Sequence, residues 1–191
     1  MPTRTARTAW NGSLETGEGQ VELSSSKIGT YDVSFPKRAA DDANGATSPE
    51  ELLAAAHSAC YAMQFSAVLG AAGGTIEQLD VKADVTLGAD PAGGFRLTGI
   101  LLTVRGEVTG IDAATFATAA EDAKQTCPLS KALTGVEITL DAQLEELSPQ
   151  HDPQWTPFAG RPLWVKPLVC RGLLFVYCSS LACESAIHRG G

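Results

Sequence analysis

The stretch SPEELLAAAHSACYAM, residues 48–63, decides the fold because it specifies the start of a long apolar helix. Ser48 is a preferred N-cap residue, and Pro49 suits the first helical position. The two acidic residues that follow lie at the positive end of the helix dipole. A serine followed three residues later by glutamate is also the pattern of a capping box. The sequence therefore predicts a helix that begins at Pro49.

This helix is apolar on nearly every side, because the sequence from Leu52 to Ile76 contains no charged residue. Such a helix either crosses a membrane or is buried completely. Its many alanines, polar residues such as His57 and Gln64, and the acidic residues before it favour burial in protein. The thin sheets expected in residues 1–147 can hardly surround it, which predicts that a second copy covers the rest in a homodimer.

Alternating apolar and polar residues predict β-strands on both sides of the helix. Residues 3–35 hold short strand-like stretches separated by an Asn-Gly pair and single glycines, which is typical of a β-meander. Apolar residues recur at every second position in residues 81–87, 100–108 and 136–144, as in strands with one face in water. We therefore expect an α+β fold with antiparallel sheets around a long buried central helix.

A second helix is predicted to begin around Asp112, with Phe116 and Ala120 on one stripe that Cys127 continues. Pro128 disfavours the helical conformation at Cys127 and can itself begin a short helix over residues 128–133. Cys127 would then lie at the positive end of a helix dipole, which lowers the pKa of a thiol.

Each helix thus carries one cysteine, Cys60 and Cys127, and two interpretations of the pair are open. Free cysteines are among the most buried residue types, so both could be inert residues of the core. In the other interpretation they are functional, because Cys60 lies on the helix that needs a partner and a dimer seam is a natural place for a pocket. The helix start at Cys127 also favours a reactive thiol.

The composition excludes several classes of function. The formal net charge is −8 and the isoelectric point is about 4.8, so no binding to nucleic acid or to an anionic membrane is expected. Five cysteines in 191 residues are too few for a disulfide scaffold. The N-terminus lacks the apolar core of a secretory signal, which predicts a cytoplasmic protein. Cysteines there are usually reduced, so functional ones are expected to do redox or metal chemistry.

Residues 148–191 differ in composition from residues 1–147. Residues 1–147 contain ten basic and twenty acidic residues, a net charge of −10. Residues 148–191 contain four basic and two acidic residues, a net charge of +2. Five of the ten prolines lie in residues 148–191 and forbid a helix where they recur. The cysteines of residues 148–191 are Cys170, Cys178 and Cys183. No two of them have the short Cys-x2-Cys spacing of a metal site. We expect this segment to lie outside the folded domain, and we assign these cysteines no role.

Residues 48–63, followed 67 residues after Cys60 by the motif Cys-Pro-Leu-Ser at 127–130, resemble the OsmC/Ohr family of thiol peroxidases. His57, three residues before Cys60, is similar to the OsmC branch of that family. The resemblance runs from about Thr5 to Leu147 and implies the intertwined homodimer of that fold.

The resemblance also implies a function for the cysteine pair. Cys60 would be the peroxidatic thiolate, which attacks the O–O bond of organic peroxides and, less efficiently, of hydrogen peroxide. Cys127 would be the resolving thiol, which forms a disulfide with the resulting sulfenic acid. An external dithiol would then reduce that disulfide. No cofactor or metal is implied, and the expected role is defence against oxidative and osmotic stress.

The same resemblance implies that an arginine and a glutamate act beside the peroxidatic cysteine, and Arg38 and Glu50 match them. Arg38 would favour the thiolate by its permanent charge, and Glu50 would orient the guanidinium. Ten helical residues rise about 15 Å, so Glu50 cannot touch Cys60 of its own straight helix. If all act at one site, the two groups must come from different subunits.

Other assignments remain open at the level of sequence. The helix dipole alone would make Cys127 the more acidic thiol, whereas the resemblance assigns that role to Cys60. His57 fits a hydrogen-bonded core histidine better than a group that tunes the thiol, and Tyr61, Met63 and Phe65 are expected in the core or around an apolar pocket. The alternative function is a redox sensor or small-molecule binding protein that uses the same cysteine pair without turnover.

Overall fold

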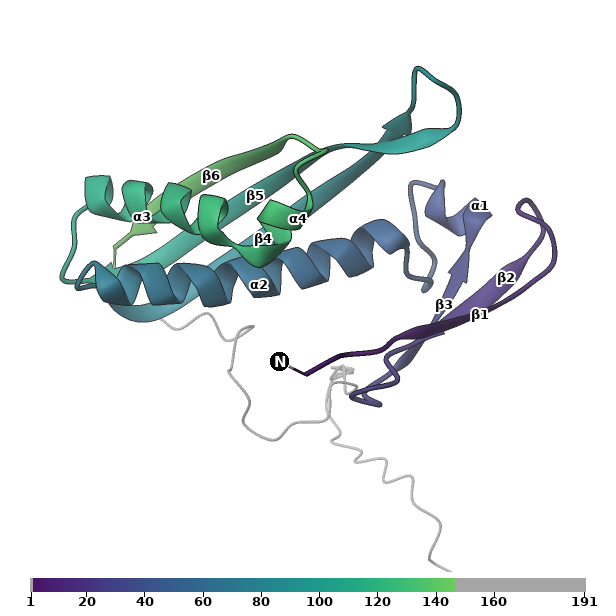
Figure 1. Ribbon diagram of the computed structural model, residues 1–191, viewed down its shortest axis with the longest axis horizontal. Helices are drawn as coiled ribbons and strands as arrows, with labels where there is room; N and C mark the ends of the chain where they lie inside the picture. The colour runs from purple at the N-terminus through teal and green to yellow at the C-terminus, as the bar shows by residue number, and fades with distance from the viewer. Residues whose placement is uncertain (1, 147–191) are drawn as a thin grey trace, which may run out of the picture. The chain divides into compact units, whose positions relative to one another are not determined.

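The computed structural model describes residues 2–146, which form the α+β fold expected from the sequence (Figure 1). The elements in chain order are β1 (Arg7–Asn11), β2 (Glu18–Glu22), β3 (Thr30–Ser34), α1 (Phe35–Arg38), α2 (Pro49–Ala71), β4 (Thr75–Ala89), β5 (Phe95–Thr109), α3 (Ala113–Thr126), α4 (Pro128–Ala132) and β6 (Ile138–Glu145). The segment 148–191, expected to lie outside the fold, falls outside the described residues, so the boundary at residue 147 stays a prediction.

The first sheet is the predicted β-meander. Strands β1, β2 and β3 pair in that order, each antiparallel to the next. Gly12, with a φ of +92°, allows the chain to turn after β1, a conformation that residues with a side chain rarely adopt. Ser34 ends β3 and caps α1 by accepting a hydrogen bond from the backbone N–H of Lys37, so the meander leads directly to Arg38.

The second sheet has the order β4-β5-β6. Strands β4 and β5 form a long antiparallel hairpin, whereas β6 runs parallel to β5. The sequence pattern had led us to expect an antiparallel sheet. The second sheet is instead mixed, because β6 is parallel to β5. The reason is the connection between β5 and β6, which crosses over through α3 and α4 and returns the chain in the same direction.

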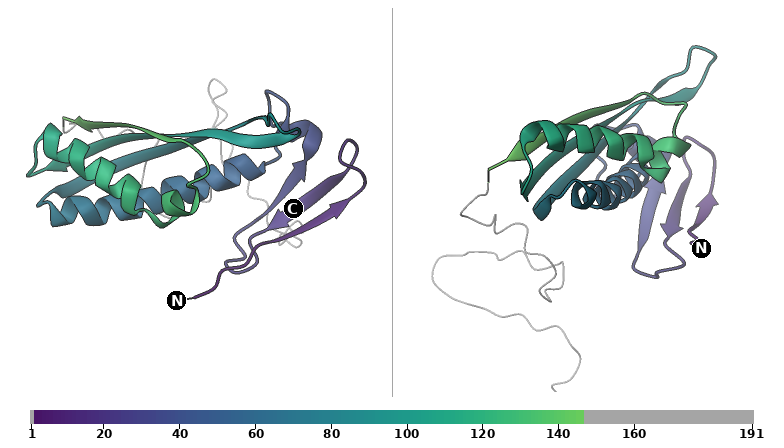
Figure 2. Two further views of the ribbon diagram at one scale, coloured as in Figure 1. Left: turned by 45° about the horizontal axis from the view of Figure 1, so that its top comes forward. Right: turned by 60° about the vertical axis from the view of Figure 1, so that its left-hand side comes forward.

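Helices α2 and α3 lie side by side on one face of the second sheet, α2 next to β4 and α3 next to β6 (Figures 1 and 2). Gly106 of β5 lets α3 approach the sheet closely, because a Cβ at this position would lie only 2.7 Å from the ring of Phe116. The ring of Phe116 in turn meets Phe65 of α2 edge to face, with centroids 5.1 Å apart. These contacts fix the position of the end of α3, where Cys127 lies.

Within one chain, α2 buries a single stripe. Its buried residues recur every four positions and are His57, Tyr61, Phe65 and Leu69, which matches one face of a helix. Tyr61 and Phe65 therefore pack in the core as expected, but Met63 is 68% exposed. Among the described residues, α2 is the one helix long and apolar enough to cross a membrane by length and composition. Its unburied apolar face is consistent with the expected second copy, which stays a prediction.

Candidate active site

The first turn of α2 has the predicted N-cap. The Ser48 hydroxyl accepts a hydrogen bond from the backbone N–H of Glu51 at 3.1 Å. The reciprocal half of the capping box does not form, because the Glu51 carboxylate instead accepts a hydrogen bond from the hydroxyl of Thr47 at 2.7 Å. The helix start nevertheless holds the neighbouring residue, Glu50, in a fixed position.

Glu50 forms an ion pair with Arg38 at this helix start. Arg38 Nη2 donates to Glu50 Oε1 at 2.6 Å, and Arg38 Nε lies 3.0 Å from Oε2. The hydrogen bond from Arg38 holds the pKa of the Glu50 carboxyl below its ordinary value, so the pair is fully charged at neutral pH. The Arg38 side chain remains 27% exposed, which leaves part of the guanidinium free to meet another anion.

The second grouping is the cysteine pair. Cys60 Sγ and Cys127 Sγ lie 3.5 Å apart, although the residues are 67 positions apart in sequence. A disulfide bond is about 2.05 Å long, so the sulfurs need to approach by only about 1.5 Å. Cys60 is half-buried, and Cys127 is fully buried. The structure thus brings together the two thiols that the sequence singled out.

Cys127 lies at the end of helix α3, as predicted. Asp112 is the N-cap of α3, and Cys127 leaves the helix with a ψ of 126° before Pro128 begins α4, as a residue before proline prefers. The Tyr61 hydroxyl of α2 donates to the carbonyl oxygen of Ala120 at 2.7 Å. This hydrogen bond, at the residue that follows Cys60, and the packing of Phe65 against α3 hold the two helices together.

The two thiols differ in their pKa within one chain. Burial raises the pKa of the Cys60 thiol, and the nearby Cys127 adds to the rise. For Cys127, burial also acts to raise the pKa, but the polar groups of the neighbouring Ser130 and Cys60 outweigh it, so its pKa is lowered. The lower pKa at Cys127 agrees with the prediction from the start of α4. The resemblance had instead assigned the more acidic thiol to Cys60. The physical reason is that Arg38 of the same chain is paired with Glu50 and lies away from Cys60.

Sequence reasoning missed the contact between Ser130 and His57. His57 Nε2 lies 2.9 Å from Ser130 Oγ, and both residues are buried. His57 is the core histidine that the sequence favoured, but only one of its ring nitrogens has a partner among the described residues. The available signal was the position of Ser130 in the motif that begins with Cys127.

The Arg38–Glu50 pair and the cysteine pair lie at different places along α2. Glu50 is in the first turn of the helix and Cys60 follows ten residues later, a rise of about 15 Å. Within one chain, therefore, the charged pair and the thiols form two separate groupings rather than one site.

Comparisons with known proteins identify the family of the chain. A model of the family described as OsmC-like protein matches residues 41–141. Peroxiredoxin OsmC of Escherichia coli (strain K12) is 41% identical over 136 residues, which cover 71% of this chain and 92% of that protein. The chain belongs to the OsmC family. The region matched by the family model contains Glu50, Cys60 and Cys127 and begins three residues after Arg38.

The chain is also similar to organic hydroperoxide resistance proteins, both in sequence and in structure. The organic hydroperoxide resistance protein OhrA of Bacillus subtilis (strain 168) is 35% identical over 127 residues, which cover 65% of this chain and 86% of that protein. The crystal structure of an organic hydroperoxide resistance protein from Elizabethkingia anophelis is 27% identical, with a TM-score of 0.62 and coverage of 76% and 98% of the two chains.

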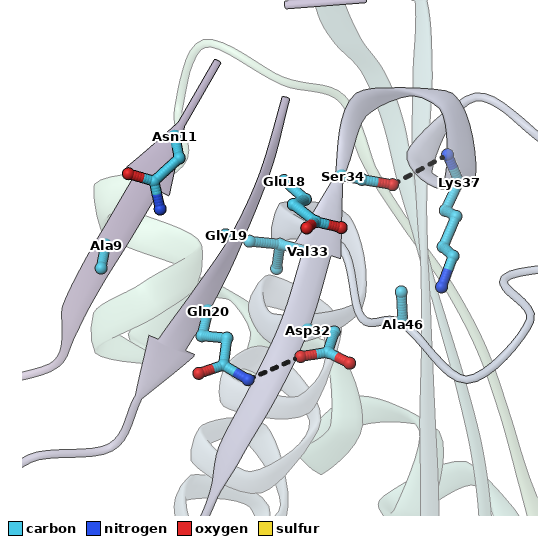
Figure 3. A pocket seen from close by; sticks show the side chains of 10 residues that line it. All are labelled: Ala9, Asn11, Glu18, Gly19, Gln20, Asp32, Val33, Ser34, Lys37 and Ala46. Atoms are coloured by element: carbon cyan, nitrogen blue, oxygen red, sulfur yellow. Dashed lines mark hydrogen bonds between the residues drawn. The ribbon is translucent and has the colours of Figure 1, made fainter. Parts of the chain in front are cut away.

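Two of the hollows that border the first sheet differ in polarity. One, of about 450 Å³, is mainly apolar and reaches Arg38; its other lining residues include Trp10, Leu14, Phe35, Pro49 and Leu52. The other, of about 400 Å³, is polar, and its Gln20 and Asp32 side chains pair with each other at 2.9 Å (Figure 3). Only the apolar hollow contains a residue of the candidate site. Within residues 2–146, no cluster of three or more His, Cys, Asp or Glu residues suits a metal ion.

Proposed function

We propose that the protein is a cysteine-based peroxidase that reduces organic hydroperoxides and hydrogen peroxide in stress defence. The observation that carries the proposal is the distance of 3.5 Å between Cys60 Sγ and Cys127 Sγ, because a sulfenic acid on one sulfur would lie within reach of the other. The relatives named peroxiredoxin OsmC and organic hydroperoxide resistance protein support the same chemistry and substrate class.

In the first step, the Cys60 thiolate attacks the distal oxygen of the peroxide. A new S–O bond forms, the O–O bond breaks, and the alkoxide leaves as an alcohol after taking a proton. Cys60 is thereby oxidised to a sulfenic acid. In the second step, Cys127 attacks the Cys60 sulfur, the disulfide forms and water leaves. An external dithiol then reduces the disulfide and restores both thiols.

A homodimer would supply what one chain lacks. Burial raises the pKa of Cys60, whereas a peroxidatic cysteine must be a thiolate. Arg38 is partly exposed and held in place by Glu50, and the face of α2 that carries Met63 is uncovered. If two copies of α2 pack antiparallel, the Arg38–Glu50 pair of each copy comes beside Cys60 of the other. The guanidinium would then favour the thiolate and stabilise the departing oxygen.

The apolar hollow that reaches Arg38 suits the organic part of a hydroperoxide. Its walls are the side chains of Trp10, Phe35 and Leu52, among others, and apolar walls favour apolar ligands over water. We therefore expect bulky organic hydroperoxides to be better substrates than hydrogen peroxide, and we expect the reaction to take place in the cytoplasm.

Peroxide consumption by the wild type, Cys60→Ser and Cys127→Ser, each with excess dithiol, tests the function. The wild type is expected to consume many equivalents of an organic hydroperoxide. Cys60→Ser is expected to consume none by this route. Cys127→Ser is expected to form a sulfenic acid that a trapping reagent labels at Cys60. Labelling at Cys127 in the Cys60→Ser variant would reverse the two roles, and a single stoichiometric oxidation of the wild type would indicate a redox sensor instead.

A further inference from the structure

The chain segment that begins with Cys127 makes a second polar contact with α2, beside the contact between the two sulfurs. His57 Nε2 of α2 lies 2.9 Å from Ser130 Oγ of α4. His57 precedes Cys60 by three residues, and Ser130 follows Cys127 by three, which is about one helical turn in each case. The segment is therefore joined to α2 at two neighbouring points, the sulfurs and this hydrogen bond.

Little else fixes α4 against α2. Helix α4 is only five residues long, and helices this short are not stable by themselves. The Cys127 side chain forms no hydrogen bond that caps α4. Among the described residues, the contact with His57 is the one side-chain hydrogen bond that α4 makes. The position of α4 therefore depends on this bond and on the packing of Leu129 against the core.

Burial makes the bond between His57 and Ser130 hard to replace. His57 is fully buried and Ser130 is 7% exposed, so water does not take the place of either partner. Burial also lowers the pKa of the His57 ring, so the ring is neutral at physiological pH. Its Nδ1 atom has no partner among the described residues, and an unpartnered buried N–H is rarer than an unpartnered acceptor. The proton is therefore on Nε2, which donates to Ser130 Oγ.

A similar hydrogen bond on the other side of the cysteine pair is open to solvent. Gln64 Nε2 of α2 donates to Thr126 Oγ1 at 3.0 Å, and this bond is exposed. Gln64 follows Cys60 by four residues, and Thr126 directly precedes Cys127. Water readily replaces a partner in an exposed hydrogen bond, so such a bond constrains a segment less than a buried one. Of the two bonds that flank the cysteines, the buried one therefore has the stronger hold on Cys127.

We propose that His57 and Ser130 are positioning residues that hold residues 127–132 against α2 and so raise the effective concentration of the Cys127 thiol at Cys60. The proposal rests on the proposed function, because it assigns the two residues to the disulfide step of that reaction. Its geometry lies within one chain. Neither residue touches the peroxide, and neither needs to contact the Cys127 sulfur.

The benefit of this bond lies in the order that it imposes before the reaction. In the disulfide step, the Cys127 sulfur attacks the Cys60 sulfur, the S–O bond breaks, and the oxygen leaves with the thiol proton as water. The disulfide holds both segments in one arrangement, and ordering a free segment costs conformational entropy. Because the buried bond already orders residues 127–132 in the reduced protein, that ordering does not oppose disulfide formation.

A redox equilibrium tests the proposal without peroxide. The full chain is equilibrated with mixtures of reduced and oxidised dithiothreitol, and mass spectrometry of alkylated peptides measures the disulfide between Cys60 and Cys127. Ser130→Ala and His57→Leu are each expected to lower the equilibrium constant for the disulfide about fivefold, as for the loss of one hydrogen bond between neutral groups. His57→Gln, whose amide can still donate to Ser130, is expected to keep most of the wild-type value.

A double-mutant cycle separates positioning from a general loss of stability. Both substitutions remove the same hydrogen bond, so the variant with Ser130→Ala and His57→Leu is expected to lose about fivefold, not the roughly 25-fold of independent effects. Gln64→Met is the matched control, because it removes the exposed bond on the other side of the cysteines. Its effect is expected to stay below about twofold. Additive losses in the double variant, or equal effects of Gln64→Met and Ser130→Ala, would overturn the proposal.

Rapid mixing with one equivalent of an organic hydroperoxide connects the bond to the reaction. Ser130→Ala is expected to slow disulfide formation about fivefold and to leave the oxidation of Cys60 unchanged. Equal slowing of both steps would show a merely structural role and overturn the proposal. A lowered redox equilibrium constant in a protein that consumes no peroxide would support the positioning and refute the peroxidase. An unchanged constant in an active peroxidase would overturn the positioning alone, so the two failures are distinguishable.

Discussion

Helix α2 carries two chemical groupings that are built in opposite ways. In its first turn, Glu50 binds Arg38, which is 12 residues earlier in the sequence, and the guanidinium stays partly exposed. In its middle, Cys60 contacts Cys127, which is 67 residues later, and Cys127 is fully buried. The charged pair needs only a helix cap and a short loop, whereas the thiol pair needs the whole packing of α3 against α2.

This difference indicates which part of the proposed site would depend on a second copy. The thiol pair is complete within one chain but lacks a cation that would lower the pKa of Cys60. The charged pair has a partly exposed cation but no thiol near it within one chain. Because about 15 Å of helix separates the two groupings, each grouping supplies what the other lacks only if they meet between chains.

The largest expected effect is that of Arg38→Met. Loss of the cation is expected to lower kcat/KM for an organic hydroperoxide about a hundredfold, the usual cost of losing one donor to a developing negative charge. Steady-state kinetics with excess dithiol measure it. Arg105→Met is the matched control, because Arg105 is also 27% exposed and also binds a carboxylate, that of Asp141. Equal losses in both variants would contradict the special role of Arg38.

Mixed dimers locate the site directly. Alone, Arg38→Met is expected to keep about a hundredth of the wild-type activity, and Cys60→Ser is expected to be inactive. When the two are co-expressed with different tags, random pairing makes half of the dimers mixed, and one of the two sites in each mixed dimer is intact. About a quarter of the wild-type activity is therefore expected to return. No recovery in purified mixed dimers would place Arg38 and Cys60 of the same chain in one site.

Glu50→Gln is expected to have a smaller effect than Arg38→Met. The amide keeps the size of the side chain but loses the charge that holds the guanidinium in three hydrogen bonds. In the proposed site, Glu50 orients the cation and does not itself face the peroxide, so a loss of about tenfold in kcat/KM is expected. Kinetics with the same hydroperoxide test this order, and a larger loss in Glu50→Gln than in Arg38→Met would contradict it.

The difference between the charged pair and the thiol pair also explains which features could be predicted from the sequence. The start of α2 and the exit of the chain at Cys127 depend on local signals. These were a cap and a proline, and the structure has each of them. The resemblance supplied the pairing of Cys60 with Cys127 and that of Arg38 with Glu50.

The features that the sequence did not predict all join distant segments. The parallel pairing of β5 with β6 depends on the path of the crossover, which an alternating pattern does not encode. The contact between His57 and Ser130 spans 73 residues, so it becomes visible only once α4 is placed against α2. Similarly, the exposure of Met63 follows from which stripe of α2 the sheet and α3 cover.

Tyr61→Phe probes the packing on which only the thiol pair depends. It removes the hydroxyl that joins α2 to the carbonyl oxygen of Ala120, and the expected loss is about 1 kcal/mol in the free energy of unfolding. Urea unfolding at a fixed protomer concentration measures it. Tyr31→Phe is the control, because Tyr31 is 40% exposed. Equal stability of the wild type and Tyr61→Phe would show that this bond does not hold the helices together.

The smallest expected effect is the pH dependence of the charged pair. Arg38 lowers the pKa of Glu50 below its ordinary value of 4.5, so the pair contributes its full stabilisation above pH 4.5. The contribution falls as the pH drops through the lowered pKa and is absent below it. Because both side chains are partly exposed, the coupling between Arg38→Met and Glu50→Gln is expected to stay below about 1 kcal/mol at neutral pH.

A double-mutant cycle of these two substitutions at neutral and at acidic pH, with a fixed protomer concentration, measures the coupling. In the Glu50→Gln background, Arg38→Met is expected to cost the same stability at both pH values, because no carboxylate remains to titrate. A coupling that persists at acidic pH would mean that the guanidinium is held by contacts other than the Glu50 charge. The cation would then be positioned by its own loop, and the larger effect expected for Arg38→Met than for Glu50→Gln would have that loop as its cause.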